Sequence, residues 1–525
     1  MRDRLSVRDH GATGSGETCE TEAIQSAIDA CADGGGGTVR VPAGEYLVGS
    51  LRLRSDVTLH LDAGATLVAS TDESRYGPRD EHLAGLLSAV GAENVALEGD
   101  GVIDGKSPEF LDTDRVMDTL GSDGLTSEEN YDQRQSDPRV PLYAEGDLDE
   151  GPVAKGEFQP APLFLALRCE GVRIEGVTIR DSPAWTVHVL GCDGATVRDV
   201  DILNDERVPH SDGINPENSR NVTITGCRIV TGDHAISPKT SDRGDTGGPC
   251  ENLLVTDCVL SSRSGAINIG PESKYDFRDH VYSNIVVRDS NRGLGVQNRE
   301  AGDVENIVFS NVTVETVMRR GAWWGQAEPI HVSSLALEAD QEVGTVRDLR
   351  FSDVVARSQG GISIVDEADS IDTVALDGVN LRIERSRVAD SRGGNVDLRP
   401  SDVRPVLVGR DVPGVYATGV TDLSLDRVTV EWGDDVPSYH SHAIECESVE
   451  GLSIDGFVGR QARDGPAIAL GSCTGVVVAD SRAAPGTDTF LLHSECADPT
   501  VAGNNVADAR TGVVAHPEPD DPGAM

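Results

Sequence analysis

The sequence predicts an all-β protein, a single-stranded, right-handed parallel β-helix with a short N-terminal capping helix. Two observations support this prediction: a short segment of alternating apolar and polar residues recurs along the chain, and helical periodicity is almost absent. Copies of the segment include NVALEGDGVI, GVRIEGVTIR, NVTITGCRIV, ENLLVTDCVL and TDLSLDRVTV. Most neighbouring copies lie about 22–32 residues apart, which is the spacing of solenoid coils. Because one coil cannot bury its own apolar face, stacking at about 4.8 Å per coil should build one continuous core.

The start of the chain fits a capped solenoid. The segment ETEAIQSAIDAC (20–31) has apolar residues at helical spacing and should form a helix over the open end of the core. Residues 34–70 then enter the first coils.

Two insertions interrupt the repeat. Residues 107–160 are polar and acidic, which predicts a solvated loop, with a cleft wall or lid as the alternative. A second insertion spans residues 384–418. We therefore predict one β-helix domain over residues 1–507 and a flexible acidic tail over residues 508–525.

The charge of the chain excludes some partners. The net charge of −44 and the pI near 4.5 make nucleic acid and anionic membranes poor partners. The chain has 4 Lys against 41 Arg, a composition that resembles the proteins of salt-loving archaea. We predict a halophilic archaeal protein, the alternative being an ordinary acidic one.

The remaining bulk features bear on location and on metal sites. No apolar run approaches the roughly 20 residues of a membrane span, and the start MRDRLSVRDHGATG has no secretion signal, so we expect a cytoplasmic protein. Four of the ten cysteines stand at equivalent points of the repeat without CxxC pairs, which predicts buried free thiols: Cys169, Cys192, Cys227 and Cys258. Neither a metal nor a cofactor is predicted, and the sequence does not indicate an oligomeric state.

The stretch TGDHAISPKTSD places Asp233 directly beside His234. Aligning the coils on Ile214 and Ile236 puts Asp212 and His234 in one column, with Asp233 diagonal to Asp212. Two carboxyl groups several Å apart suit inverting glycoside hydrolysis, in which one acid protonates the leaving oxygen and the other activates water. An Asp at a coil turn is more often only a turn residue, so the spacing alone leaves both interpretations open.

From about residue 5 to residue 480 the chain resembles the family 28 glycoside hydrolases, the polygalacturonases. The matching text includes VRDHGATGSGETCETEAIQSAIDAC, GVTIRDSPAWTVHVLGC, HSDGINPENSRNVTITGCRIVTGDHAISPKT and WWGQAEPI. The resemblance implies a pectin-lyase-like solenoid and a hydrolase of pectic oligosaccharides.

The resemblance also implies an acid–base pair. The family's Asn-Thr-Asp motif maps to residues 210–212 and keeps Asp212, which helps to hold the attacking water. Its Gly-Asp-Asp motif maps to residues 232–234 and keeps Asp233 as the general acid, while His234 replaces the second water-holding aspartate. Asp233 should be protonated because Asp212 repels a second negative charge. A neutral His234 near Asp212 would share the task of orienting the water.

Other family residues are missing. The Gly-His-Gly motif maps to residues 263–265, without its histidine, and the Arg-x-Lys motif maps to residues 295–297, with Gln297 in place of its lysine. Charge complementarity to galacturonate is thereby lost, unless Arg292 and Arg299, which flank the segment, substitute for the missing cations.

Three more residues are candidates for substrate binding. Lys239 corresponds to a lysine that usually follows the Gly-Asp-Asp motif, although a solvated turn lysine is the alternative. Glu272 is expected at the floor of the cleft, and His188 matches a family position near it, with a structural strand histidine as its alternative.

The leading hypothesis is an inverting, polygalacturonase-like glycosidase that trims oligosaccharides from the chain end inside the cell. One alternative is a hydrolase of another plant-type linkage, such as rhamnogalacturonan. A lyase or epimerase would need calcium and a basic residue, and the aligned columns contain no Arg or Lys. A non-catalytic carbohydrate-binding β-helix is the alternative that the missing motif residues keep open.

Overall fold

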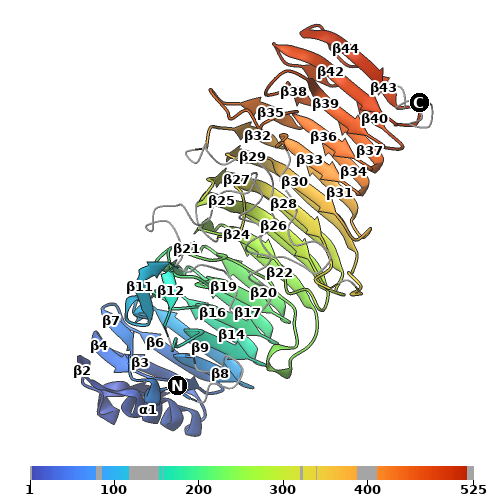
Figure 1. Cartoon of the computed structure of the whole chain (residues 1–525). Coiled ribbons are helices and arrows are strands. Elements are labelled where there is room, and N and C mark those ends of the chain that lie inside the picture. Colours follow the sequence, from blue (N-terminus) through green and yellow to red (C-terminus); the bar gives the residue numbers. More distant parts are fainter. Residues whose placement is uncertain are drawn as a thin grey trace. The chain divides into compact units, whose positions relative to one another are not determined.

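The protein is described by a computed structural model, which covers residues 3–77, 85–116, 153–156, 158–319, 323–338, 340–386 and 411–516. The chain forms two compact units, one of residues 1–120 and 147–286, the other of residues 121–146 and 287–525. Each unit consists of stacked parallel strands (Figure 1), which confirms the right-handed parallel β-helix as the fold class. The single domain expected over residues 1–507 stays a prediction.

Unit 1 has three parallel ladders, as expected when each coil contributes one strand to each face. The ladder that carries the site contains β5 (Leu51–Leu53), β8 (Leu87–Val90), β13 (Phe164–Leu167), β16 (Val187–Leu190) and β19 (Ile214–Glu217). The second contains β1 (Asp3–Ser6), β3 (Gly37–Val41), β6 (Val57–Leu61), β9 (Glu93–Gly99), β14 (Glu170–Glu175), β17 (Asp193–Arg198), β20 (Arg220–Thr225) and β22 (Cys250–Thr256). The third contains β2 (Ser15–Cys19), β4 (Gly44–Val48), β7 (Ala65–Ala69), β10 (Val102–Asp104), β15 (Thr178–Arg180), β18 (Asp201–Leu203), β21 (Arg228–Thr231) and β23 (Val259–Ser262).

The core of unit 1 lies between these ladders. Apolar side chains at matched positions of successive coils stack inside it and are at most 1% exposed: Val39, Leu59, Leu97, Ile174, Val197, Ile224 and Val255. Because strand side chains alternate, the polar residues between them point outward. All ten cysteines are free, and the four at repeat positions are buried, as the sequence predicts.

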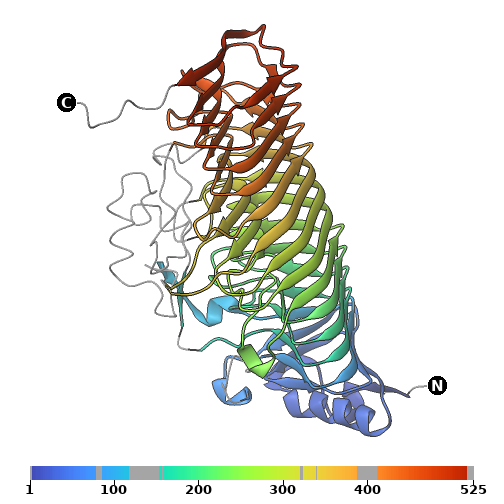
Figure 2. The same ribbon diagram turned by 90° about the vertical axis from the view of Figure 1, so that its right-hand side faces the viewer.

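Helix α1 (Thr21–Asp33) lies at the N-terminal end of the unit 1 stack (Figure 2). It buries Ile24, Ala27, Ile28 and Cys31, which confirms the capping helix expected over residues 20–31. No helix in the described part of the chain is long and apolar enough to cross a membrane.

Unit 2 repeats the pattern. One of its sheets contains β26 (Arg292–Asn298), β28 (Glu328–Ser334), β30 (Ile362–Asp366), β33 (Val415–Thr418), β36 (Ile444–Glu447), β39 (Pro466–Gly471), β42 (Thr487–Ser494) and β44 (Ala509–His516). The opposing ladders contain β27 (Val304–Thr316), β29 (Val346–Ser358), β31 (Asp372–Asp377), β32 (Asn380–Ile383), β34 (Thr421–Asp426), β35 (Thr429–Trp432), β37 (Glu450–Asp455), β38 (Val458–Gly459), β40 (Val477–Ala479), β41 (Arg482–Ala483) and β43 (Thr500–Ala502).

Asn and Asp residues allow the bends between ladders. Asn221 and Asn252 have φ of 56° and 55°, in the left-handed region that these side chains tolerate. Asn252 donates to Asn221 Oδ1 at 3.1 Å, and Asn221 donates to Asp193 Oδ1 at 2.7 Å, so the bends of three coils are hydrogen-bonded in a row. The Asp- and Asn-rich turns of the repeat therefore have a structural role.

The first insertion is anchored at both described ends. Strands β11 (Leu111–Val116) and β12 (Val153–Lys155) form an antiparallel pair, and Leu111 and Val153 pack on Val208. The base of the insertion is thus fixed beside the loop that leads to Asp212. The rest of it, like most of the second insertion, lies outside the described residues.

The predicted tail is wrong for residues 509–516. They form β44, which pairs in parallel with β42. This segment contains no proline, so every backbone N–H can join the ladder, whereas prolines recur from residue 517 onward.

Candidate active site

The alignment of coils at the site is correct. Ile214 pairs with Ile236, and Ile236 pairs with Ile267, in parallel bridges. Asp212 and His234 thus stand at equivalent positions of neighbouring coils, each two residues before its isoleucine. Both side chains are buried, as is that of Asp233: the three residues Asp212, His234 and Asp233 are 2%, 4% and 6% exposed, respectively.

Asp212 is the most perturbed carboxyl group of the site. Burial, and then the negative charge of Asp233, raise its pKa well above the ordinary value, while the nearby Lys239 ammonium opposes the rise. Lys239 Nζ lies 4.0 Å from Asp212 Oδ2, and the Asn215 amide, with its nitrogen facing the carboxyl group, donates to the same oxygen at 3.0 Å. The role of Asp233 as the protonated general acid stays a prediction.

Asp233 is held in a fixed turn. Its Oδ1 accepts the backbone N–H of His234 at 2.9 Å. Its carbonyl oxygen accepts hydrogen bonds from the hydroxyl groups of Thr231 (2.6 Å) and Ser262 (2.7 Å). These hydrogen bonds fix the direction of the Asp233 carboxyl group, which lies close enough to Asp212 for its charge to raise the pKa of Asp212.

The imidazole of His234 occupies space that a glycine leaves open. His234 Nδ1 accepts the backbone N–H of Gly265 at 3.2 Å and lies 3.7 Å from Asp233 Oδ1. A Cβ on Gly265 would lie 3.0 Å from His234 Nδ1. The part of His234 in orienting water stays a prediction.

Lys239 and Glu272, both expected to bind substrate, contact each other. Lys239 Nζ lies 3.1 Å from Glu272 Oε2. Burial lowers the pKa of Lys239, but the charges of Glu272, Asp212 and Asp233 together raise it above its ordinary value. Lys239 is therefore a charged, buried neighbour of the acid–base pair, which argues against a solvated turn lysine.

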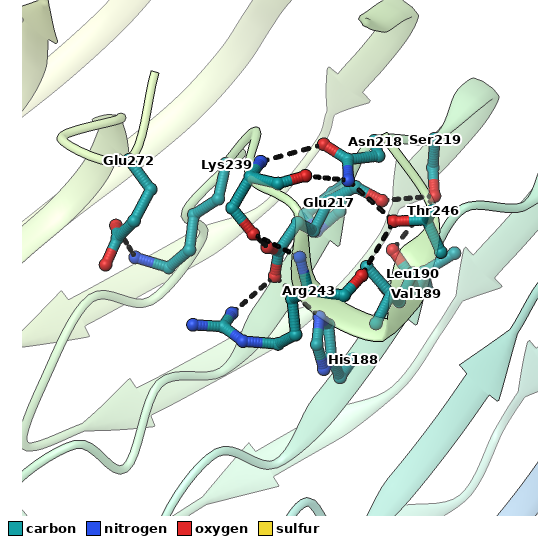
Figure 3. A network of polar contacts seen from close by, with 12 residues as sticks. His188, Val189, Leu190, Glu217, Asn218, Ser219, Lys239, Arg243, Thr246 and Glu272 are labelled. Atoms are coloured by element: carbon teal, nitrogen blue, oxygen red, sulfur yellow. Dashed lines mark hydrogen bonds and ion pairs between the residues drawn. The ribbon is translucent and has the colours of Figure 1, made fainter. Parts of the chain in front are cut away.

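His188 belongs to a network of charged groups that the sequence did not reveal (Figure 3). Its Nε2 lies 2.9 Å from Glu217 Oε2, and Arg243 Nη1 donates to the same oxygen at 2.6 Å, while the Ser241 hydroxyl donates to Glu217 Oε1. Burial opposes ionisation of Glu217, but these partners lower its pKa to about 2. His188 is 1% exposed, so its side chain contacts this network and is shielded from solvent.

Trp185 joins this network to Lys239. Arg243 Cζ lies 4.5 Å and Lys239 Nζ 5.4 Å from the centre of the Trp185 ring, and His188 meets the ring edge-on at 4.9 Å. The signal that could have revealed Glu217 is its strand: Ile214 points into the core, so Asn215 and Glu217 point to the outer face that carries the site.

Three predicted substrate residues lie in unit 2. Arg292 and Arg299 are fully buried, and Gln297 is 2% exposed. Arg292 Nη2 lies 3.4 Å from Glu328 Oε1, and Arg299 Nη2 donates to Ser333 Oγ at 3.0 Å. In this structure neither guanidinium is presented to solvent, and the substrate role of all three stays a prediction.

Metal ligands do not gather in the described residues: no group of three His, Cys, Asp or Glu side chains there could hold a metal ion.

Comparison with known proteins agrees with this geometry. The model of the glycosyl hydrolases family 28 matches residues 151–388, which include the site. This match supports glycoside hydrolase family 28. A second model, rhamnogalacturonase A/epimerase, pectate lyase-like, matches residues 5–72.

Known proteins are similar to this chain in sequence over part of their length. A probable polygalacturonase of Vitis vinifera is 28% identical, over 61% of this chain and 62% of the relative. An exo-poly-alpha-D-galacturonosidase of Dickeya chrysanthemi is 26% identical, over 60% of this chain and 56% of the relative. The chain thus spans less than two thirds of the length of these relatives, whose names indicate the glycosidase class.

Two solved structures confirm the fold. An exopolygalacturonase from Thermotoga maritima is 25% identical, with a TM-score of 0.55 over 73% of this chain and 87% of that one. A polygalacturonase from Erwinia carotovora ssp. carotovora is 22% identical, with a TM-score of 0.54 over 70% of this chain and 92% of that one.

Proposed function

We propose that the chain is an inverting, polygalacturonase-like glycoside hydrolase that removes sugars from the ends of pectic oligosaccharides. The observation that supports it most is the pair of buried carboxyl groups on neighbouring coils, one of which has a raised pKa because it is buried and because the other is charged. Such a pair holds one proton between two groups, which is what acid–base hydrolysis of a glycosidic bond requires. Exo action is proposed because two of the similar proteins are named exo-acting enzymes.

In this proposal one carboxyl group protonates the leaving oxygen, and the other, with neutral His234, orients the attacking water. The resemblance assigns the acid to Asp233 and the water to Asp212. Burial and the charge of Asp233 raise the pKa of Asp212, so the two roles need a direct test.

The test compares Asp233→Asn and Asp212→Asn on two substrates. Each substitution should lower kcat on trigalacturonate by about 10²–10⁴-fold, the usual contribution of one acid or base. A p-nitrophenyl galacturonide has a good leaving group that needs little protonation, so loss of the acid should cost much less on it than loss of the base. Asp201→Asn, which removes a carboxylate paired with Arg228 on the surface, is the matched control. Full activity of both site variants on both substrates would refute the assignment of Asp212 and Asp233 as the acid–base pair.

A hydrolase of rhamnogalacturonan is the second candidate. It is favoured by the match of residues 5–72 to the rhamnogalacturonase A/epimerase model and by the missing Arg-x-Lys pair. Reducing-end release from rhamnogalacturonan and polygalacturonan oligomers, measured at high salt, separates the two. Activity on neither would favour the non-catalytic carbohydrate-binding alternative. Halophilic origin and cytoplasmic location stay predictions.

A further inference from the structure

The network around Glu217 has no part in the acid–base step, yet it keeps a charge in the interior. The side chain of Glu217 is 0% exposed, and its pKa of about 2 keeps it ionised. A buried carboxylate is unfavourable unless charged partners compensate it. Here the compensation comes from His188 and Arg243, so the position of Arg243 is set by a charge that cannot move.

Arg243 is fixed from other directions as well. Its guanidinium lies over the Trp185 ring, at 4.5 Å from the ring centre. Its backbone N–H donates to Ser241 Oγ at 3.0 Å, and this hydroxyl donates in turn to Glu217. A guanidinium held by an ion pair, a ring and its own backbone is pre-organised, which is the property that a recognition residue needs.

The guanidinium still has donors to offer. Of its five N–H donors, only one, on Nη1, makes a hydrogen bond within the described part of the chain, and its side chain is 20% exposed. The planar fork of Arg fits a carboxylate through two parallel hydrogen bonds. In Figure 3 the other terminal nitrogen of Arg243 points away from Glu217.

The position relative to the acid–base pair follows from Trp185. Lys239 lies over the same ring as Arg243, and its Nζ is 4.0 Å from Asp212 Oδ2. Lys239 itself is already paired with Glu272 at 3.1 Å. Arg243 and Lys239 thus contact one ring, and Lys239 in turn lies beside Asp212.

We propose that Arg243 recognises the carboxylate of an acidic sugar in the subsite beside Asp212 and Asp233, with Glu217 and His188 as positioning residues. The inference rests on the proposed glycosidase function and names the substrate group that this site selects. Arg243 would thereby bind the uronate carboxylate that the Arg-x-Lys pair binds in the family pattern. Because Glu217 already compensates the charge of Arg243, selection comes from the geometry of the fork.

The experiment measures KM and kcat of Arg243→Gln on trigalacturonate and on its methyl ester, in which each carboxylate is replaced by a neutral, slightly larger ester group. We expect KM on the acid to rise about 10- to 100-fold, the usual effect of losing hydrogen bonds to a charged group, with kcat and the ester little changed. Glu217→Gln should give a smaller rise on the acid, because Arg243 remains but loses its anchor. Arg220→Gln, which removes a surface partner of Asp193, should change neither substrate.

An equal rise of KM on both substrates, or none, would overturn the proposal. Arg243→Lys keeps the charge but not the fork and should show the same selective loss; it replaces Arg243→Gln if that variant does not fold. Calorimetric titration with trigalacturonate measures its binding to the protein independently of turnover. Binding that depends on Arg243 in a protein that hydrolyses no oligosaccharide would refute the glycosidase and keep this assignment, whereas hydrolysis indifferent to Arg243 would refute the assignment alone.

Discussion

Replacing Lys239 with Met tests the electrostatics of the acid–base pair most directly. Lys239 is a buried cation 4.0 Å from Asp212 Oδ2 and opposes the rise in the pKa of Asp212. Without it, the carboxyl pair should bind protons more tightly. Because the pair titrates as a unit, both the acidic and the alkaline limbs of the pH–rate profile should move to higher pH.

The distance sets the size of the shift. Two unit charges 4 Å apart interact by about 4 kcal/mol at an effective dielectric constant of about 20. The Lys239 ammonium also forms an ion pair with Glu272 at 3.1 Å, so we assign about half of that energy to its interaction with Asp212. At about 1.4 kcal/mol per pH unit, the limbs should move up by about one to two units.

The assay is the pH dependence of kcat/KM for the parent and Lys239→Met. The double variant Lys239→Met, Glu272→Gln is the control: it also removes the carboxylate that Lys239 neutralises, and it should shift less. A profile that Lys239→Met leaves in place, in a protein that remains folded and active, would refute the idea that this cation sets the proton affinity of the pair.

Three further predictions concern stability and packing. The folded pKa of Glu217, about 2, lies below the unfolded value of about 4.3, so this carboxylate contributes about 3 kcal/mol above pH ~4.5, and that contribution disappears as the pH falls to ~2. Urea unfolding of Glu217→Gln should therefore depend less on pH in this window, and parallel curves for the two proteins would contradict this. Gly265→Ala should displace the His234 ring and lower kcat about tenfold with little change in Tm, but should have no such effect in a His234→Ala background; an equal loss in both backgrounds would show that the ring is not the target. The net charge of −44 predicts that Tm rises from about 0.1 M to about 3 M KCl, and a flat dependence would argue against a halophilic protein.

The fold was predictable because its signal is local and repeated. Alternating residues at matched positions of successive coils stack into one ladder, so the periodicity of the sequence states the pairing directly. The same regularity places Asp212 level with His234 from the amino-acid sequence alone, and the bridge between Ile214 and Ile236 confirms it. The last strand was missed because its eight residues repeat only part of the pattern and prolines begin directly after it.

The network around Arg243 was not predictable for a physical reason. Arg243 lies in a loop after the coil of Asp233, 26 residues from Glu217, and loops carry no periodic signal. Its approach to Glu217 depends on the path of that loop and on the ring of Trp185 from an earlier coil. The raised pKa of Asp212 was not predictable for a related reason, since it depends on burial and the sequence shows only which groups are neighbours.

His234, a departure from the family pattern, packs against a residue that the pattern keeps, because Gly265 is the last glycine of the Gly-His-Gly motif. A ring at position 234 needs the space that a side chain at position 265 would take, since a Cβ there would lie 3.0 Å from His234 Nδ1. The backbone N–H of Gly265 also donates to His234 Nδ1 at 3.2 Å, which holds the ring in place. One coil thus provides the titratable group and the next provides both its space and its hydrogen bond. A glycine at position 265 is thus the condition for a ring at position 234, and kcat of Gly265→Ala in the parent and in the His234→Ala background tests whether that ring takes part in hydrolysis.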